Sequence, residues 1–134
     1  MNLLLDTHIL IWALNDSPFL STKARELILD PDNTIYYSTI SVWEVLLKHA
    51  RRPVAIPFNE IDFANACREA GFMPLQLSDK HILTVHTLSR QAGTKEHNDP
   101  FDRLLLAQAK AENFYFLTHD ELIPGYGEKC IIEG

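Results

Sequence analysis

The chain has 134 residues, long enough for one domain with a buried core, and its 46% hydrophobic and 22% charged residues are ordinary fractions for a soluble globular protein. Its formal net charge of −6 argues against a protein that holds nucleic acid mainly by its own positive charge, and it favours a basic protein partner. There is no apolar run near the roughly 20 residues that span a bilayer, no basic flank at the N-terminus and only two cysteines, so the sequence predicts a cytoplasmic protein without a membrane partner.

Strands and helices are predicted to alternate along the first part of the chain. Leu3–Asp6 is a short apolar run that predicts a buried strand, and Thr7–Leu14 predicts the helix that follows it. Ser17-Pro18 ends that helix. The next elements are a helix, a turn and a β-branched, aromatic strand, at Ser21–Leu29, residues 30–33 and Ile35–Thr39.

A capping motif marks the third predicted helix. Ser41-Val42-Trp43-Glu44 matches the S-x-x-E capping box, in which the two polar side chains satisfy free backbone N–H groups at a helix start. We therefore expect a helix over Val42–Arg51, followed by an extended linker bracketed by Pro53 and Pro57.

The second half of the chain continues the alternation. A helix over Asn59–Ala70 stops at Gly71, and Phe72–Leu77 is a strand that Pro74 restricts to a sheet edge or a strand start. The remaining elements are a helix from Ser78 to about Arg90, a polar loop at Gln91–Asn98, a long helix with Asp99 as N-cap and Asn113 as its end, and strands at Phe114–Thr118 and Cys130–Glu133.

This order of elements predicts an α/β fold. Strands that alternate with helices form parallel sheets with helices on both faces. We expect one domain over residues 1–134, built as a Rossmann-like three-layer sandwich with a central, mainly parallel sheet flanked by helices.

Four acidic residues stand at the ends of apolar segments that lie far apart in the chain. They are Asp6, Glu44, Asp102 and Asp120. The carboxyl ends of parallel strands meet at one edge of a sheet, where ligands bind. Carboxylates gathered there repel one another unless a cation joins them, and Mg²⁺ or Mn²⁺ suits oxygen ligands. The pattern is that of a metal-dependent nuclease.

Each acid also has an ordinary structural role. Asp6 suits the N-cap of the first helix, Glu44 the third position of a capping box, Asp102 a first helical turn and Asp120 a turn. Capping is the favoured role of Asp99. Independent capping, however, does not require the other four acids to share one edge of the sheet.

Histidines and basic residues give weaker signals. None of the six histidines forms a zinc motif, and His97 and His119 are interpreted as polar rim residues in preference to general acids. The stretch Lys48–Arg52 is the densest basic patch, and it suits an RNA backbone contact or a solvated helix end about equally.

Four segments in order carry a resemblance to the PIN-domain family. Leu3–Thr7 resembles its opening motif, Ser38–Val45 its second, His97–Ala109 its third in a subgroup with D-P-F-D-R, and Phe116–Asp120 its fourth. Together they cover nearly the whole chain, and its length is similar to that of the small VapC-type toxins of bacterial toxin–antitoxin pairs.

The resemblance implies a metal-dependent endoribonuclease that is dimeric and silenced by a cognate antitoxin with a basic tail. Its catalytic and metal-binding positions match Asp6, Glu44, Asp102 and Asp120. Asp99 is an extra acid of the subgroup and a second candidate beside Asp102, whereas many members have Asn at the position of Asp120. Thr7, Ser41 and Thr118 are candidate minor ligands, and Arg103 is a candidate phosphate contact or carboxylate partner.

Two other functions are compatible with a first-strand aspartate. A haloacid-dehalogenase-like phosphatase shares that aspartate and the doubly wound sheet, but Asp6-Thr7-His8 lacks its second aspartate. A catalytically silent RNA- or protein-binding module is the other alternative, and the presence of all four acids argues against it.

Overall fold

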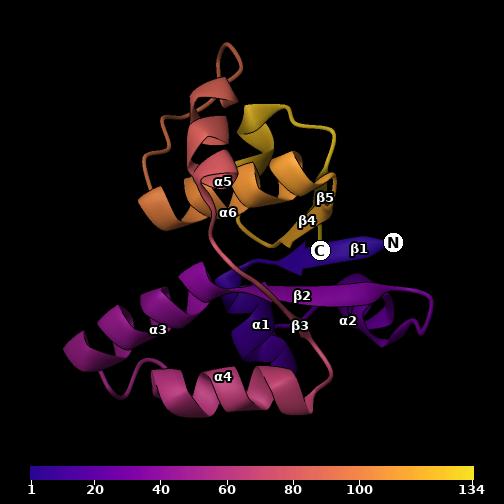
Figure 1. The fold of residues 1–134 in the computed structure, drawn as a ribbon, viewed down its shortest axis with the longest axis vertical. Coiled ribbons are helices and arrows are strands. Elements are labelled where there is room, and N and C mark those ends of the chain that lie inside the picture. The colour runs from indigo at the N-terminus through magenta and orange to yellow at the C-terminus, as the bar shows by residue number, and fades with distance from the viewer.

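A five-stranded sheet, parallel throughout, forms the centre of the computed structural model, which describes residues 1–134 (Figure 1). The strands lie in the order β3-β2-β1-β4-β5. Their bounds are β1 Asn2–Leu5, β2 Thr34–Ser38, β3 Met73–Leu75, β4 Tyr115–Thr118 and β5 Ile131–Glu133. The predicted α/β fold class is therefore confirmed.

Six α-helices flank the sheet. They are α1 Thr7–Leu14, α2 Thr22–Leu29, α3 Thr39–Arg51, α4 Glu60–Glu69, α5 Asp79–Thr84 and α6 Pro100–Glu112, with short 3₁₀ helices at Val85–Thr87 and Ile123–Tyr126. Figure 1 shows α5 and α6 on one face, and α1, α2 and α4 on the other, so the molecule has three layers. No helix is both long and apolar enough to cross a bilayer.

One apolar core lies on each face of the sheet. Successive strand side chains point to opposite faces, so Leu3 and Leu5 of β1 enter the core with α1, α2 and α4, whereas Leu4 enters the core with α6. Helix α3 contributes to both cores, through Val45 to the first and Ile40 to the second. Because β1 pairs with strands on both sides and is covered on both faces, its three leucines are completely buried.

Several local predictions are confirmed. Pro74 lies in β3, which is an edge strand, where a missing N–H donor does not interrupt the sheet. Asn113 caps the C-terminus of α6 with a left-handed backbone (φ 58°), and Gly71 adopts φ 85° just after α4. Asp99 is the N-cap of α6, and Pro100 is its first residue, as expected.

The predicted start of the third helix is wrong. Helix α3 begins at Thr39, and its N-cap is Ser38, whose Oγ accepts from the backbone N–H of Ile40 at 3.0 Å. Strand β2 therefore ends at Ser38 and not at Thr39. Ser41 and Glu44 do not form a capping box; both side chains point instead toward the first helix, as described below.

The helix predicted to reach about Arg90 is shorter. Helix α5 ends at Thr84, the 3₁₀ turn ends at Thr87, and Leu88 is extended and buried against the α6 side of the sheet. The hydroxyl of Thr87 donates to the carbonyl of Thr84 at 2.7 Å, a local bond that competes with continued helix. Arg90 then binds the carbonyls of Lys95 and Leu122.

Candidate active site

A cavity of about 310 Å³ lies at the carboxyl edge of the sheet. Its lining residues are Asp6, His8, Trp12, Glu44, Lys48, Asp99, Asp102, His119 and Asp120. Asp6 follows β1, Asp120 comes two residues after β4, Glu44 lies in the second turn of α3, and Asp102 in the first turn of α6. The structure thus brings all four acids predicted from the sequence into one cavity, together with Asp99.

Asp6 is 5% exposed and accepts a hydrogen bond on each carboxylate oxygen. Oδ1 accepts from the backbone N–H of Thr7 at 2.7 Å, which also makes Asp6 the N-cap of α1, and Oδ2 accepts from Thr118 Oγ1 at 2.7 Å. Burial raises the pKa of Asp6 to about 6, and the charges of Glu44 and Asp120 add to the rise, although the two hydrogen bonds work against it. Asp6 therefore both caps α1 and lines the acidic cavity.

Glu44 is 2% exposed, and both of its oxygens are engaged. Oε1 accepts from Thr7 Oγ1 at 2.7 Å, and Thr7 Oγ1 in turn accepts from Ser41 Oγ at 2.8 Å. Oε2 is paired with Lys48 Nζ at 2.5 Å. Partial burial acts to lower the pKa of Lys48, but the hydrogen bond and charge of Glu44 outweigh it and raise this pKa.

The three candidate hydroxyl ligands support the carboxylates. Thr7 and Ser41 hold Glu44, and Thr118 holds Asp6. Each hydroxyl contacts a carboxylate oxygen or another hydroxyl of this chain. Their direct effect is to fix the positions of the two buried acids.

Asp99 and Asp102 differ in their surroundings. Asp99 Oδ1 accepts from the backbone N–H groups of Phe101 and Asp102, at 2.9 and 3.1 Å, as a helix cap does. Asp102 has no such backbone donor, and its Oδ2 lies 3.3 Å from Nε2 of His97. Burial, reinforced by the charges of neighbouring acids, raises the pKa of Asp102 to about 8.

Asp120 and Arg103 are partly buried, whereas Asp6 and Glu44 are buried. Asp120 Oδ1 accepts from the backbone N–H of Leu122 at 2.8 Å, and its own N–H donates to Thr118 Oγ1 at 3.1 Å, so the ordinary turn role is also fulfilled. Arg103 is partly buried and forms no ion pair with a carboxylate.

His97 is the site residue that the sequence analysis undervalued. It is 7% exposed rather than a rim residue, and its Nδ1 lies 2.6 Å from the hydroxyl of Tyr126. The ligand atoms of His97, Asp102 and Asp120 all lie within 4.8 Å of one another, and no other three His, Cys, Asp or Glu side chains come together so closely. Burial lowers the pKa of His97 and so favours its neutral form.

The donor set fits a divalent cation. Its carboxylate oxygens are hard ligands of the kind that Mg²⁺ and Mn²⁺ take. Asp6 is buried and Asp102 is partly buried, and both have raised pKa values, so ionising them in the folded chain has a cost that a bound cation would offset.

A basic groove adjoins the acidic cavity. This groove has a volume of about 290 Å³ and is lined by His8, Lys48, Arg51, Arg52, Ala55 and Ile56. His8 and Lys48 belong to both linings, so the two hollows are neighbours. Positive side chains therefore stand directly beside the acids.

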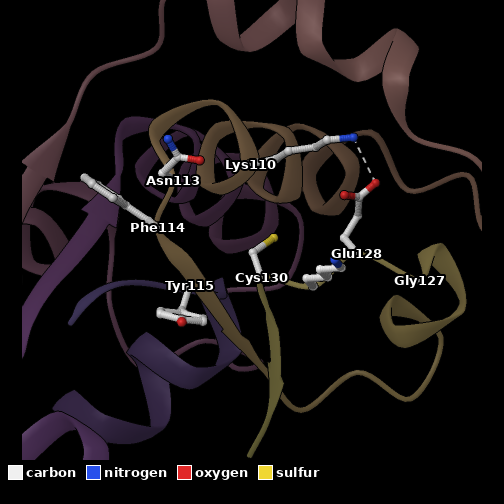
Figure 2. A pocket seen from close by; sticks show the side chains of 8 residues that line it. Lys110, Asn113, Phe114, Tyr115, Gly127, Glu128 and Cys130 are labelled. Atoms are coloured by element: carbon white, nitrogen blue, oxygen red, sulfur yellow. Dashed lines mark hydrogen bonds and ion pairs between the residues drawn. The ribbon is translucent and has the colours of Figure 1, made fainter.

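A larger cavity lies elsewhere, at the opposite edge of the sheet. It has a volume of about 480 Å³ and lies beside the starts of β4 and β5 (Figure 2). Lys110 and Glu128 pair there at 2.9 Å, and burial raises the pKa of the Cys130 thiol, which keeps it unreactive. This cavity gathers no set of acids, so the acidic cavity is the better candidate for a catalytic centre.

Comparisons with known proteins agree with the fold. The sequence model of a family described as PIN domain matches residues 3–129. VapBC2 from Rickettsia felis, solved bound to a DNA fragment from their promoter, contains a similar chain with 21% identity and a TM-score of 0.68, covering 100% of this chain and 98% of that chain. VapBC-1 from nontypeable Haemophilus influenzae contains another, with 16% identity and a TM-score of 0.65, covering 99% and 98%. A comparison with curated proteins gave no match.

Proposed function

Since this chain belongs to the PIN domain family, we propose that it is a metal-dependent endoribonuclease and the toxin of a bacterial toxin–antitoxin pair. The proposed enzyme is a single PIN domain over residues 1–134, acts in the cytoplasm and forms a homodimer. Its proposed metal ligands and catalytic residues are Asp6, Glu44, Asp102 and Asp120, with Asp99 beside them.

One observation carries this proposal: acids from four separate segments line one cavity at the carboxyl edge of the sheet. Burial, together with the charges of neighbouring acids, raises the pKa of Asp6 to about 6 and the pKa of Asp102 to about 8. A protein that only needed helix caps would leave such acids in solvent. A buried acidic cluster is favoured only when a cation neutralises it in the working state.

The proposed reaction is hydrolysis of an RNA phosphodiester, leaving a 5′-phosphate. Asp6, Glu44, Asp102 and Asp120 would hold Mg²⁺ or Mn²⁺, which would supply activation of a water molecule and neutralisation of charge on the phosphate. The chain's own contribution is positional: Thr118 fixes Asp6, and Thr7 with Ser41 fixes Glu44. Such hydrogen bonds to ligating carboxylates hold the geometry of a metal site.

The basic groove offers a path for the RNA backbone. Arg51 and Arg52 follow Lys48 by one helical turn and line a hollow that meets the acidic cavity. A strand whose scissile phosphate lies among the acids would place flanking phosphates against these cations. Arg103, free of carboxylate partners, is a second proposed phosphate contact.

The proposed partner is an antitoxin with a basic tail. The two similar chains belong to VapBC assemblies, one of them bound to promoter DNA. In this chain Asp102 has no lysine or arginine partner of its own, so an arginine or lysine from such a tail could pair with it once its proton is displaced. It would make a charge-assisted contact there and compete with the metal ion for the same oxygens.

The alternatives find less support. The PIN family match covers residues 3–129 and disfavours a haloacid-dehalogenase-like phosphatase. A catalytically silent binding module would have no use for an acid at each of the four positions.

Cleavage of single-stranded RNA tests the proposal. The wild-type protein should cut RNA in Mn²⁺ or Mg²⁺ and not in EDTA, and Asp6→Asn should be inactive. Asp16→Asn is the matched control, because Asp16 is an exposed acid paired with Arg25 outside the cavity. RNA binding without cutting would support the silent module instead, and full activity in Asp6→Asn would overturn the site.

A further inference from the structure

His97 is buried and makes several contacts although it lies in a polar loop. Its Nδ1 lies 2.6 Å from the hydroxyl of Tyr126, and that hydroxyl donates to the carbonyl of His97 at 3.2 Å. The two rings meet edge to face at 90°, and the guanidinium carbon of Arg90 lies 4.7 Å from the centre of the tyrosine ring. The imidazole is therefore fixed in position and in direction.

These contacts suit the neutral imidazole that is protonated at Nδ1. In that tautomer the tyrosine hydroxyl gives its single proton to the carbonyl of His97, and its oxygen accepts from Nδ1–H. Nε2 of the neutral ring then carries a lone pair. That lone pair lies beside Asp102, a residue of the acidic cavity, whose Oδ2 is 3.3 Å from Nε2.

Two lone-pair donors at that separation need a proton or a metal ion between them. Adjacent ligands of an octahedral ion with bonds of about 2.1 Å stand about 3 Å apart, close to the observed spacing of Nε2 and Oδ2. Asp120 supplies a third atom, since the ligand atoms of all three residues lie within 4.8 Å of one another. Metal-binding histidines also donate their other N–H to an oxygen, as Nδ1 does to Tyr126.

We propose that His97, Asp102 and Asp120 form a ligand set for a divalent transition-metal ion, so that the protein binds Mn²⁺ in preference to Mg²⁺. The proposal rests on the proposed nuclease function and names a nitrogen ligand that the four-acid site lacks. Imidazole binds transition metals well, whereas Mg²⁺ prefers oxygen ligands and retains its waters. The set shares Asp102 and Asp120 with the four-acid site, so His97 extends that site toward Tyr126.

Metal affinity of the purified protein provides the first test. Titration calorimetry with Mn²⁺ and with Mg²⁺, at constant ionic strength, should show that His97→Ala weakens Mn²⁺ binding by at least about 10-fold, with Mg²⁺ binding changed by less than about 3-fold. His119→Ala is the matched control: His119 lines the same cavity, but its Nδ1 is bonded to the carbonyl of Gly134 at 2.7 Å. It should leave the Mn²⁺ preference intact.

Pulsed electron paramagnetic resonance of bound Mn²⁺ provides the second test, and its decisive measurement is made on the wild-type protein. Imidazole coordination should give a ¹⁴N coupling in wild type and in His119→Ala, and the coupling should disappear in His97→Ala. Tyr126→Phe keeps the ring packing but removes the hydroxyl, so it should weaken Mn²⁺ binding less than His97→Ala does.

Absence of a ¹⁴N coupling in wild type would overturn the proposal, even if His97→Ala failed to fold. Equal losses of Mn²⁺ and Mg²⁺ affinity in His97→Ala would do so too, since His97 would then be a positioning residue that donates Nε2–H to Asp102. Neither result bears on the nuclease proposal, which is tested separately by whether the wild-type protein cleaves RNA in Mg²⁺.

Discussion

Asp102→Asn should stabilise the metal-free protein at neutral pH. In the native state the pKa of Asp102 is raised from 3.8 to about 8, with burial as the largest cause. Between these two values the native state binds more protons than the unfolded state, so stability falls as the pH rises through this range. At about 1.4 kcal/mol per pH unit, the loss at pH 7 is about 4 kcal/mol, and at pH 4 it is less than about 1 kcal/mol. Asparagine has nearly the same shape and no charge, so it avoids the loss.

Urea unfolding in EDTA, at pH 4 and at pH 7, measures this effect. The variant should exceed wild type in free energy of unfolding by up to about 4 kcal/mol at pH 7, with the gap closing at pH 4. Asp16→Asn, at an exposed acid paired with Arg25, should change stability by less than about 1 kcal/mol at both pH values. Saturating Mn²⁺ should reverse the order, because only wild type retains the ligand. Equal free energies of unfolding for the variant and wild type at pH 7 would refute the electrostatic reasoning. A difference that is as large at pH 4 as at pH 7 would refute it too.

Three further outcomes are expected. Asp99→Ala should cost about 1 kcal/mol in urea unfolding, because a helix cap is lost, and it should keep most RNA cleavage; complete inactivity would make Asp99 a ligand. Lys48→Met should destabilise the metal-free protein by about 1 to 2 kcal/mol, because Oε2 of the buried Glu44 then loses its cation, and Mn²⁺ should restore the stability; no change in EDTA would contradict the pairing. Arg51→Glu with Arg52→Glu should reduce the slope of log affinity against log salt by about 1.4 for single-stranded RNA, measured on a non-cleaving variant, and an unchanged slope would place the RNA elsewhere.

The sheet and its acidic edge were predictable because their signals are local. A run of three leucines followed by aspartate specifies a central strand and its carboxyl end without help from distant residues. Pro74 limits its strand to an edge, and Asn113 ends its helix, for equally local reasons. Parallel pairing brings the carboxyl ends of β1, β2 and β4 to one edge, and the helices that start beside this edge place Glu44 and Asp102 there with Asp6 and Asp120.

Features that depend on two distant segments were not predictable. Ser38 and Ser41 are both reasonable N-caps, and the choice between them is made by where β2 stops pairing with its neighbours. His97 lies in a loop with no periodicity, and its burial depends on Tyr126, 29 residues further along the chain. The pairing of Glu44 with Lys48 fits i,i+4 spacing, but the near-complete burial of Glu44 does not follow from that spacing.

In the metal-free protein, a lysine side chain and a proton neutralise two of the carboxylates that a metal ion would bind. Lys48 neutralises Glu44 through an ion pair, and the raised pKa of Asp102 keeps a proton on that acid at neutral pH, where it can donate to Nε2 of His97. A divalent ion must displace both, so its affinity should rise as the pH approaches 8 and the proton becomes easier to remove. A basic antitoxin side chain faces the same competition at Asp102, but its single charge neutralises less of the cluster than a divalent ion does. Contacts outside the cavity must therefore supply much of the affinity of an inhibitory tail. The acidic cavity itself contributes more to selectivity for a cation than to binding affinity.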